Sequence, residues 1–444
     1  MPKTPNNSVR TALGVEAASA RGYYSRSVSI LTVAWLVYFV DVFMRYNIPT
    51  VMPVLRQEYN WSATTVGWVD SAYLWAYALA QVPWGYISER WLGAKWTVTI
   101  GTAMIAVASV VFAWHVESLT LGIAARALIG AGAAAIWVPL NPALARWFAP
   151  HRRGLQNGIL GSGGTAGTLA GGALMPILVT GSVSLFGLSA IQSGFLWSAL
   201  PGIVMVLIVP LVILNRPEEI GLRSLDANEQ EPALAGKQAP PKAAEPSFGY
   251  IMTHSGYPYL LAIVYAGYLG ALYFVWTWFA AYLNAVYGIN VRSAGLLWAV
   301  AATAPAFISQ PVGGFLSDRI GHVRAVAGAL LMTAITSVGF VILAVLGKAV
   351  PWQFVLALAL VFSFFVNMWV LAWPFTTMMF PTSAGGPIGG FMNTFAQLVG
   401  AAAPVVSGYF IDKTGSYVMV FVIGAGCAFV GFIAALFLKE RRVI

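Results

Sequence analysis

Long apolar runs recur along this chain, and they constrain its fold more strongly than any motif does. A helix of about 20 apolar residues crosses the hydrocarbon core of a bilayer. Runs of this length lie near residues 28–55, 63–88, 94–116, 118–148, 153–181, 190–215, 256–287, 293–317, 323–347, 350–380, 385–411 and 416–438. They are apolar on every face, which fits helices and not the alternating strands of a barrel. The sequence therefore predicts twelve transmembrane helices.

The composition agrees with an integral membrane protein. Of the 444 residues, 59% are apolar and 9% are charged, whereas a soluble domain carries about 25% charged residues. The single cysteine, Cys427, excludes an intramolecular disulfide and a cysteine-based metal site. No nucleophile–base–acid arrangement and no metal-ligand cluster is visible in the sequence. We therefore expect neither an enzyme nor a bound cofactor or metal.

The distribution of basic residues predicts the orientation. Most of the 24 Lys and Arg residues lie in the two ends of the chain, the middle and alternate loops. Such an excess marks the cytoplasmic side, so both termini are expected there, in a plasma (inner) membrane. The net charge of +9 is spread over many loops and indicates topology, not nucleic-acid binding. The expected order is a cytoplasmic tail (1–27), a six-helix bundle (28–215), a cytoplasmic linker (216–253), a second six-helix bundle (254–438) and a C-terminal tail (439–444).

The two halves carry the same signature at the end of their second helix. Gln81-Val-Pro-Trp-Gly-Tyr-Ile-Ser-Glu-Arg90 in the first half matches Gln310-Pro-Val-Gly-Gly-Phe-Leu-Ser-Asp-Arg319 in the second. Repeated halves and these loops resemble the major facilitator superfamily along the whole chain. The resemblance implies two pseudo-symmetric six-helix bundles, alternating access, and a cavity lined by helices 1, 4, 7 and 10. The acidic–basic pairs Glu89, Arg90, Asp318 and Arg319 are expected to form a cytoplasmic gate.

Away from the helix ends, four charged residues lie inside the predicted membrane-spanning segments: Asp41, Arg45, Asp70 and Arg126. A charged side chain is costly in hydrocarbon, so we expect each of these residues to have a role in function. Asp41 and Arg45 are four residues apart and share a helix face. Arg45 and Arg126 fall at similar depths, and a guanidinium is matched to carboxylate or phosphate. Two arginines against one carboxylate suit a monovalent anion; the alternative is a self-contained pair beside an arginine bonded to backbone carbonyls.

A finer resemblance is to the anion:cation symporters, the relatives of vesicular glutamate, sialic acid and sugar-acid carriers. It rests on Arg45-Tyr-Asn47, on the second-helix stretch from Gly67 to Gly85, on Arg126-Ala-Leu-Ile-Gly130, and on Gly390-Phe-Met-Asn393. The resemblance implies that Arg45, Arg126 and Tyr77 contact an organic anion and that Asn393 adds polar contacts. We also expect substrate contacts from Tyr73, Tyr273, Trp373 and Gln397.

Two departures from that family concern proton coupling. The usual fourth-helix carboxylate is replaced by Ala133, and the acid that many relatives carry directly before the first-helix arginine is replaced by Met44. Asp41 is the remaining candidate for the proton. Organophosphate:phosphate antiporters pair the first-helix arginine with one in the seventh helix, but residues 260–283 contain no charge. A carboxylate therefore fits better than a phosphate dianion.

Other helices offer aromatic and small residues. Tyr265, Tyr268 and Tyr273 of the seventh helix are near helical spacing and are candidates for an aromatic wall. Asn367, Asn393 and Gln397 serve equally well as contacts between helices. Gly163, Gly167 and Gly171 in the fifth helix indicate close packing against another helix.

The sequence thus predicts a secondary transporter, working as a monomer in the lipid bilayer. Its partners are a small organic anion, most simply a monocarboxylate, and a proton. An anion exchanger or uniporter, including phosphate-type antiport, is the alternative. A transporter-like membrane sensor is a distant one.

Overall fold

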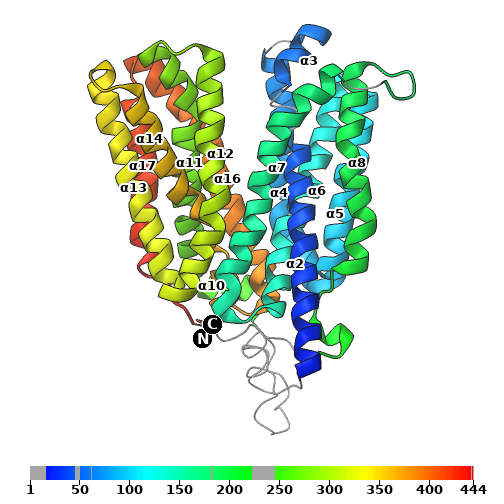
Figure 1. The fold of residues 1–444 in the computed structure, drawn as a ribbon. Coiled ribbons are helices and arrows are strands. Elements are labelled where there is room, and N and C mark those ends of the chain that lie inside the picture. Colours follow the sequence, from blue (N-terminus) through cyan, green and yellow to red (C-terminus); the bar gives the residue numbers. More distant parts are fainter. Residues whose placement is uncertain are drawn as a thin grey trace. The chain divides into compact units, whose positions relative to one another are not determined.

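The computed structural model describes residues 17–45, 51–61, 63–181, 184–222, 246–441 and 443, and every regular element among them is a helix (Figure 1). The long helices are α2 (Ala17–Arg45), α4 (Ala63–Ile87), α5 (Gly93–Trp114), α6 (Leu119–Trp147), α7 (Arg153–Gly181), α8 (Ala190–Val212), α11 (Tyr257–Tyr287), α12 (Val291–Ile320), α13 (His322–Leu346), α14 (Trp352–Val366), α16 (Thr382–Thr414) and α17 (Val418–Ala435). The short ones are α3 (Met52–Tyr59), η1 (Ser88–Leu92), η2 (Pro150–Arg152), η3 (Pro217–Ile220), α10 (Phe248–His254), η4 (Gly347–Ala349), η5 (Asn367–Ala372) and α15 (Phe375–Met378).

The all-helical membrane fold predicted from the sequence is confirmed. Eleven stretches of the described residues are long and apolar enough to cross a membrane. One of them, Ala72–Trp114, runs from within α4 through the π-helical turn η1 to the end of α5. With α4 and α5 counted separately, the described residues contain twelve long helices, one for each of the predicted apolar runs.

Two helices differ from the predicted segments. The first was expected over 28–55, but α2 begins at Ala17 and a separate short helix, α3, begins at Met52 with Pro53 in its first turn. The tenth was expected as one helix and is divided by the 3₁₀ segment η5. Pro374 follows η5 and cannot donate to an α-helical hydrogen bond. The backbone before Pro374 is wound as a tighter 3₁₀ helix, in which the Trp373 N–H donates to the Val370 carbonyl, three residues back, over 3.2 Å.

The chain divides into two compact units. Unit 1 comprises Met1–Gln156, Gly163–Pro246 and Pro381–Gly390, and unit 2 comprises Asn157–Ser162, Ser247–Phe380 and Phe391–Ile444. In unit 1, α6 packs against both α4 and α5, and α5 packs against α8. In unit 2, α17 packs against α11 and α13, and α14 packs against α12 and α13.

Small residues set the helix spacing in unit 1. A Cβ at Gly167 of α7 would lie 2.4 Å from the carbonyl oxygen of Phe39 in α2, and one at Gly163 would lie 2.8 Å from that of Trp35. The close packing predicted for the fifth-helix glycines is thereby confirmed at these two positions. The core of unit 2 is instead aromatic, with Phe340 edge-on to both Phe279 and Phe362.

Candidate anion-binding site

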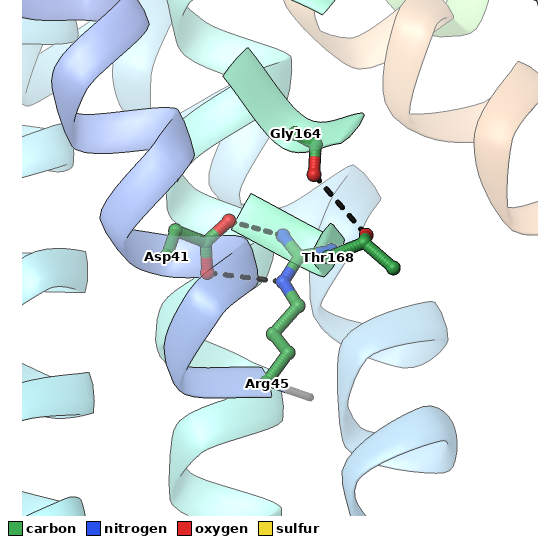
Figure 2. A network of polar contacts seen from close by, with 4 residues as sticks. All are labelled: Asp41, Arg45, Gly164 and Thr168. Atoms are coloured by element: carbon green, nitrogen blue, oxygen red, sulfur yellow. Dashed lines mark hydrogen bonds and ion pairs between the residues drawn. The ribbon is translucent and has the colours of Figure 1, made fainter. Parts of the chain in front are cut away.

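The core of the candidate site is a buried ion pair within α2. Arg45 donates from Nε to Asp41 Oδ1 over 3.0 Å and from Nη2 to Asp41 Oδ2 (Figure 2). The two residues lie one helical turn apart, which places both side chains on one face. Asp41 is 1% exposed and Arg45 is 9% exposed. A bidentate contact of this kind satisfies both carboxylate oxygens, so the pair is tolerated in the interior.

Two tyrosines of α4 lie against the Arg45 guanidinium. Its Cζ is 4.5 Å from the ring centroid of Tyr77 and 5.7 Å from that of Tyr73. The two rings are stacked with their centroids 5.7 Å apart, as expected for residues one turn apart on a helix. An aromatic face attracts a cation. The rings therefore hold the guanidinium from the side of α4 while Asp41 holds it from within α2.

Arg126 of α6 joins the same group of side chains. Its Cζ lies 5.1 Å from the Tyr73 ring centroid, and its Nη1 donates to the Arg45 carbonyl oxygen over 3.3 Å. Arg126 is 1% exposed. The close approach of α4 and α6 explains its position, since a Cβ at Gly130, one turn further along α6, would lie 2.2 Å from the Tyr73 carbonyl oxygen.

Helix α7 packs beside this group. Gly167 of α7 lies against α2 backbone, and a Cβ there would approach Phe43 N to 2.9 Å. Thr168 donates to the Gly164 carbonyl over 3.1 Å and is drawn with the ion pair in Figure 2. An aromatic contact also joins α2 to α6: the ring centroids of Tyr38 in α2 and Trp137 in α6 lie 4.7 Å apart. Sequence reasoning did not select Tyr38 or Trp137, because apolar helices carry many aromatic residues.

The positions where related carriers hold further acids are apolar here. Ala133 is fully buried on α6. Met44 is also fully buried, with its sulfur 2.8 Å from where a Cβ of Gly202 on α8 would lie. The predicted residue Asp70 lies in α4, and its side chain is outside the described part of the structure. The acid seen in contact with Arg45 is Asp41 of the same helix.

The predicted residues of unit 2 form two local groups. The Tyr273 hydroxyl of α11 donates to Gln397 Oε1 of α16 over 3.0 Å, and its ring covers Gly400. Trp373 lies edge-on to Tyr265 with centroids 5.9 Å apart, and Trp369 lies on the same ring at 6.0 Å. Asn393 is 2% exposed on α16, one turn before Gln397. The sequence predicted Tyr273, Gln397 and Trp373 but not Trp369, which stands in the 3₁₀ segment η5.

The predicted gate residues each have a defined neighbour. Glu89 Oε2 accepts from Arg146 Nη2 over 2.7 Å in unit 1. Asp318 Oδ1 lies 3.6 Å from His322 Nε2 in unit 2. Arg90 and Arg319 lie over the rings of Tyr86 and Phe315. The sequence marked the acids and arginines of both turns but did not identify Arg146 and His322 as partners.

A metal centre has no basis in the described side chains, among which no three His, Cys, Asp or Glu residues cluster. The arrangement instead offers two guanidiniums, two phenol rings and one carboxylate, all within unit 1. Such a set can bind an anion by bidentate hydrogen bonds and can exchange the carboxylate partner of Arg45 for another anion.

Comparison with known proteins gives concordant results. Residues 34–404 and 261–443 match the family model described as the Major Facilitator Superfamily. The chain is 27% identical over 430 residues to the "Probable sulfoacetate transporter SauU" of Cupriavidus necator, covering 94% of each protein. It is 25% identical over 422 residues to the "Hexuronate transporter" of Bacillus subtilis, covering 90% of this chain and 91% of that protein. The crystal structure of the E. coli fucose:proton symporter FucP shares the fold, with a TM-score of 0.71 at 17% identity over 92% of this chain and 98% of that chain.

Proposed function

The chain belongs to the Major Facilitator Superfamily, whose matched relatives are transporters and not enzymes, and we propose that it carries a small organic monocarboxylate across the membrane. It is a multi-pass membrane protein. Our proposal places the substrate carboxylate at Arg45 and Arg126. The protein would act as a monomer in the inner membrane, with both termini in the cytoplasm.

The observation that carries the proposal is that the guanidiniums of Arg45 and Arg126 both lie against the ring of Tyr73. Arg45 and Arg126 approach the same ring to 5.7 and 5.1 Å, and both are buried. Asp41 pairs with Arg45. Each guanidinium presents a planar fork of N–H donors matched to a carboxylate, so two of them close together suit an organic anion.

The class of anion follows from charge and from the relatives. Sulfoacetate and hexuronate, named for two relatives, are organic acids. Helix α11 of this chain contains no charged residue, so it offers no third cation for a phosphate dianion. Tyr273, Trp373, Asn393 and Gln397 would contact the remainder of the substrate. Their aromatic and amide groups suit a molecule with a partly apolar or hydroxylated body.

Coupling to a proton would use Asp41. A substrate carboxylate that binds Arg45 competes with Asp41 for the same two N–H donors. Protonation of Asp41 removes the competing charge and frees the guanidinium. Proton and anion would then enter the site together, which is symport. Alternating access would expose the site to each side in turn, with the turns at Glu89–Arg90 and Asp318–Arg319 acting as gates.

Anion exchange is the second candidate, and the buried Ala133 favours it. With no carboxylate at that position, a mechanism in which Asp41 never takes up a proton remains consistent with the site. In such a mechanism the incoming anion replaces the outgoing one at Arg45 and Arg126, and Asp41 stays paired throughout.

The test is transport of labelled small carboxylates, sulfonates and sugar acids by the purified protein in liposomes. Uptake is measured with an inward proton gradient, without a gradient, and with unlabelled acid inside. Accumulation that collapses with the gradient supports symport. Uptake that needs internal anion and ignores the gradient supports exchange. Absence of uptake for every acid, with transport of a neutral or cationic solute instead, would overturn the proposal.

A further inference from the structure

Helix α5 exposes an apolar stripe with a tryptophan at each end. Trp96 and Trp114 are 50% and 48% exposed. They lie about five helical turns, or about 27 Å, apart on the same face of the helix. Between them the stripe continues through the exposed side chains of Ile100, Val107 and Val111. Other faces of α5 pack against α6 and α8, so the stripe is the outward side of this helix.

The stripe has the dimensions of a bilayer. The hydrocarbon core is about 30 Å thick, and tryptophan gathers at its two boundaries, where an amphipathic ring meets the headgroups. Trp96 and Trp114 therefore mark the two boundaries, and the residues between them face acyl chains. Just beyond Trp114 the chain carries an acid, Glu117, whereas just before Trp96 it carries two cations, Arg90 and Lys95. The Trp96 boundary thus offers positive charge to a lipid headgroup.

Both cations lie beside aromatic rings that are exposed at this boundary. Arg90 Cζ is 5.7 Å from the ring centroid of Tyr86, and Lys95 Nζ is 5.5 Å from that of Trp96. Trp91, which follows Arg90, is 69% exposed. Arg90 is itself exposed and Lys95 is half-buried. Each cation therefore stands next to a ring that reaches the boundary, at the level of the headgroups.

Neither charge is neutralised by an acid within the described part of the chain. The ring contacts are the side-chain interactions that Arg90 and Lys95 make there, and no described carboxylate lies within ion-pair distance of either. The acid next to Arg90, Glu89, accepts from Arg146 over 2.7 Å. Glu219 follows the segment that contacts the first turn of α5, and its carboxylate accepts from two backbone N–H groups of its own turn.

The backbone between the two cations is held in one conformation. Gly93, at the end of η1, has a φ of +69°, which favours glycine. A Cβ at Gly93 would lie 2.5 Å from the Asn215 side chain, whose Oδ1 accepts from the Lys95 N–H over 2.8 Å. The segment after α8 thereby fixes the turn that carries both cations, so they are kept at the same end of the stripe.

We propose that Arg90 and Lys95 bind the phosphate of an anionic phospholipid whose acyl chains lie along the exposed stripe of α5. A guanidinium matches phosphate with two parallel N–H donors, and an ammonium binds it as a point charge. Basic residues beside a membrane helix attract anionic lipids. A zwitterionic lipid carries its own cation, which offsets the charge of its phosphate. The site therefore discriminates by headgroup charge.

The sequence repeat provides an internal comparison. The positions of unit 2 that correspond to the two cations are Arg319 and Arg324, so both charges are kept. The position that corresponds to Trp96 is Ala325, which is 7% exposed. The start of α13 therefore offers no ring there. Arg324 also donates to the last carbonyl of α12 over 3.5 Å. We expect the lipid site in unit 1 and not at the matching turn of unit 2.

Lipid binding is measured on the full-length protein in detergent by native mass spectrometry. The probes are phosphatidylglycerol and phosphatidylcholine with identical acyl chains. The parent protein should bind the first phosphatidylglycerol roughly fivefold more tightly than phosphatidylcholine, or better. Arg90→Gln combined with Lys95→Gln should lower the affinity for phosphatidylglycerol by roughly fivefold for each cation and leave phosphatidylcholine binding unchanged. Equal affinity of the parent for both lipids, or an unchanged affinity in the variant, would overturn the proposal.

A matched variant separates the site from net charge. Arg319→Gln combined with Arg324→Gln removes the same two charges from unit 2 and should leave phosphatidylglycerol binding close to that of the parent. Equal losses in the two double variants would mean that the lipid follows net charge, and the site would be wrong. Should the unit 1 double variant fail to fold, Lys95→Gln is compared with Lys95→Arg, and only the first should lose affinity. No transport is measured, so the outcome is independent of the proposed function.

Discussion

Arg126 of α6 donates a hydrogen bond to the main-chain carbonyl of Arg45, the residue at which α2 ends. The carbonyls at the end of a helix carry partial negative charge and lack partners within the helix. Arg126 supplies such a partner. The bond explains how two guanidiniums lie near one another, since the second is anchored to backbone while the first is anchored to Asp41.

The first prediction concerns the shape of the cation at position 126. In Arg126→Lys the charge remains, but the planar fork that reaches both a carbonyl and an anion is lost. A hydrogen bond to a charged group contributes about 1.5–3 kcal/mol, so kcat/KM for carboxylate uptake should fall by roughly 10- to 100-fold. The measurement is initial uptake in proteoliposomes.

Arg26→Lys is the control for Arg126→Lys, because Arg26 is exposed on α2. It should retain full uptake. If Arg126→Lys and Arg26→Lys transport equally well, the anion does not depend on the Arg126 guanidinium.

The second prediction separates the ring of Tyr73 from its hydroxyl. Both arginines approach the ring face, within 5.7 and 5.1 Å. Tyr73→Phe keeps the ring and should transport close to the parent rate. Tyr73→Leu removes it, and the loss of cation–π contacts of about 0.5–2 kcal/mol corresponds to roughly a 2- to 30-fold fall in kcat/KM. Equal losses in both variants would show that the hydroxyl, not the ring, matters.

Much of the fold and part of this site could be predicted from the sequence. Apolar length alone gives the helices, because the bilayer permits few other structures. The Asp41–Arg45 pair follows from helical spacing, which is a local property of one element. The break at Pro374 is also local, yet its extent over η5 depends on hydrogen bonds that spacing does not show.

Contacts between helices could not be predicted in the same way. The bond from Arg126 to the Arg45 carbonyl depends on how closely α6 approaches the end of α2, which apolar surfaces do not encode. The contact of Asp318 with His322 crosses the break between α12 and α13. The repeat marked the acids of both turns, but their neighbours Arg146 and His322 are visible only in the structure.

The third prediction tests Asp41 as the coupling group. Asp41→Asn removes the charge that competes with the substrate and the group that takes up the proton. Uptake driven by a proton gradient should fall to the level reached without a gradient, whereas exchange of external for internal carboxylate should continue. Both modes are measured in the same proteoliposomes.

Glu58→Gln, at an exposed position on α3, should leave both transport modes unchanged. Proton-driven accumulation that survives Asp41→Asn in full would assign the coupling to another residue.

The fourth prediction is about stability. A Cβ at Gly167 would lie 2.4 Å from the Phe39 carbonyl oxygen, so Gly167→Ala forces α2 and α7 apart. Overpacking of this kind costs about 1–3 kcal/mol and should lower the melting temperature in detergent. Gly172→Ala is the matched control on the same helix, because a Cβ at Gly172 meets nothing within 4 Å. It should be neutral or stabilising, since alanine favours a helix by about 1 kcal/mol.

The fifth prediction distinguishes the structural from the functional role of the ion pair. Removing one member of a buried pair leaves an uncompensated charge and costs about 3–5 kcal/mol. Arg45→Gln alone should therefore destabilise the protein, whereas Arg45→Gln combined with Asp41→Asn should recover most of the melting temperature. Transport should remain lost in the double variant, because no cation at position 45 then meets the anion. If transport recovered together with stability, the Asp41–Arg45 pair would have only a structural role, and Arg126 would bind the anion without Arg45.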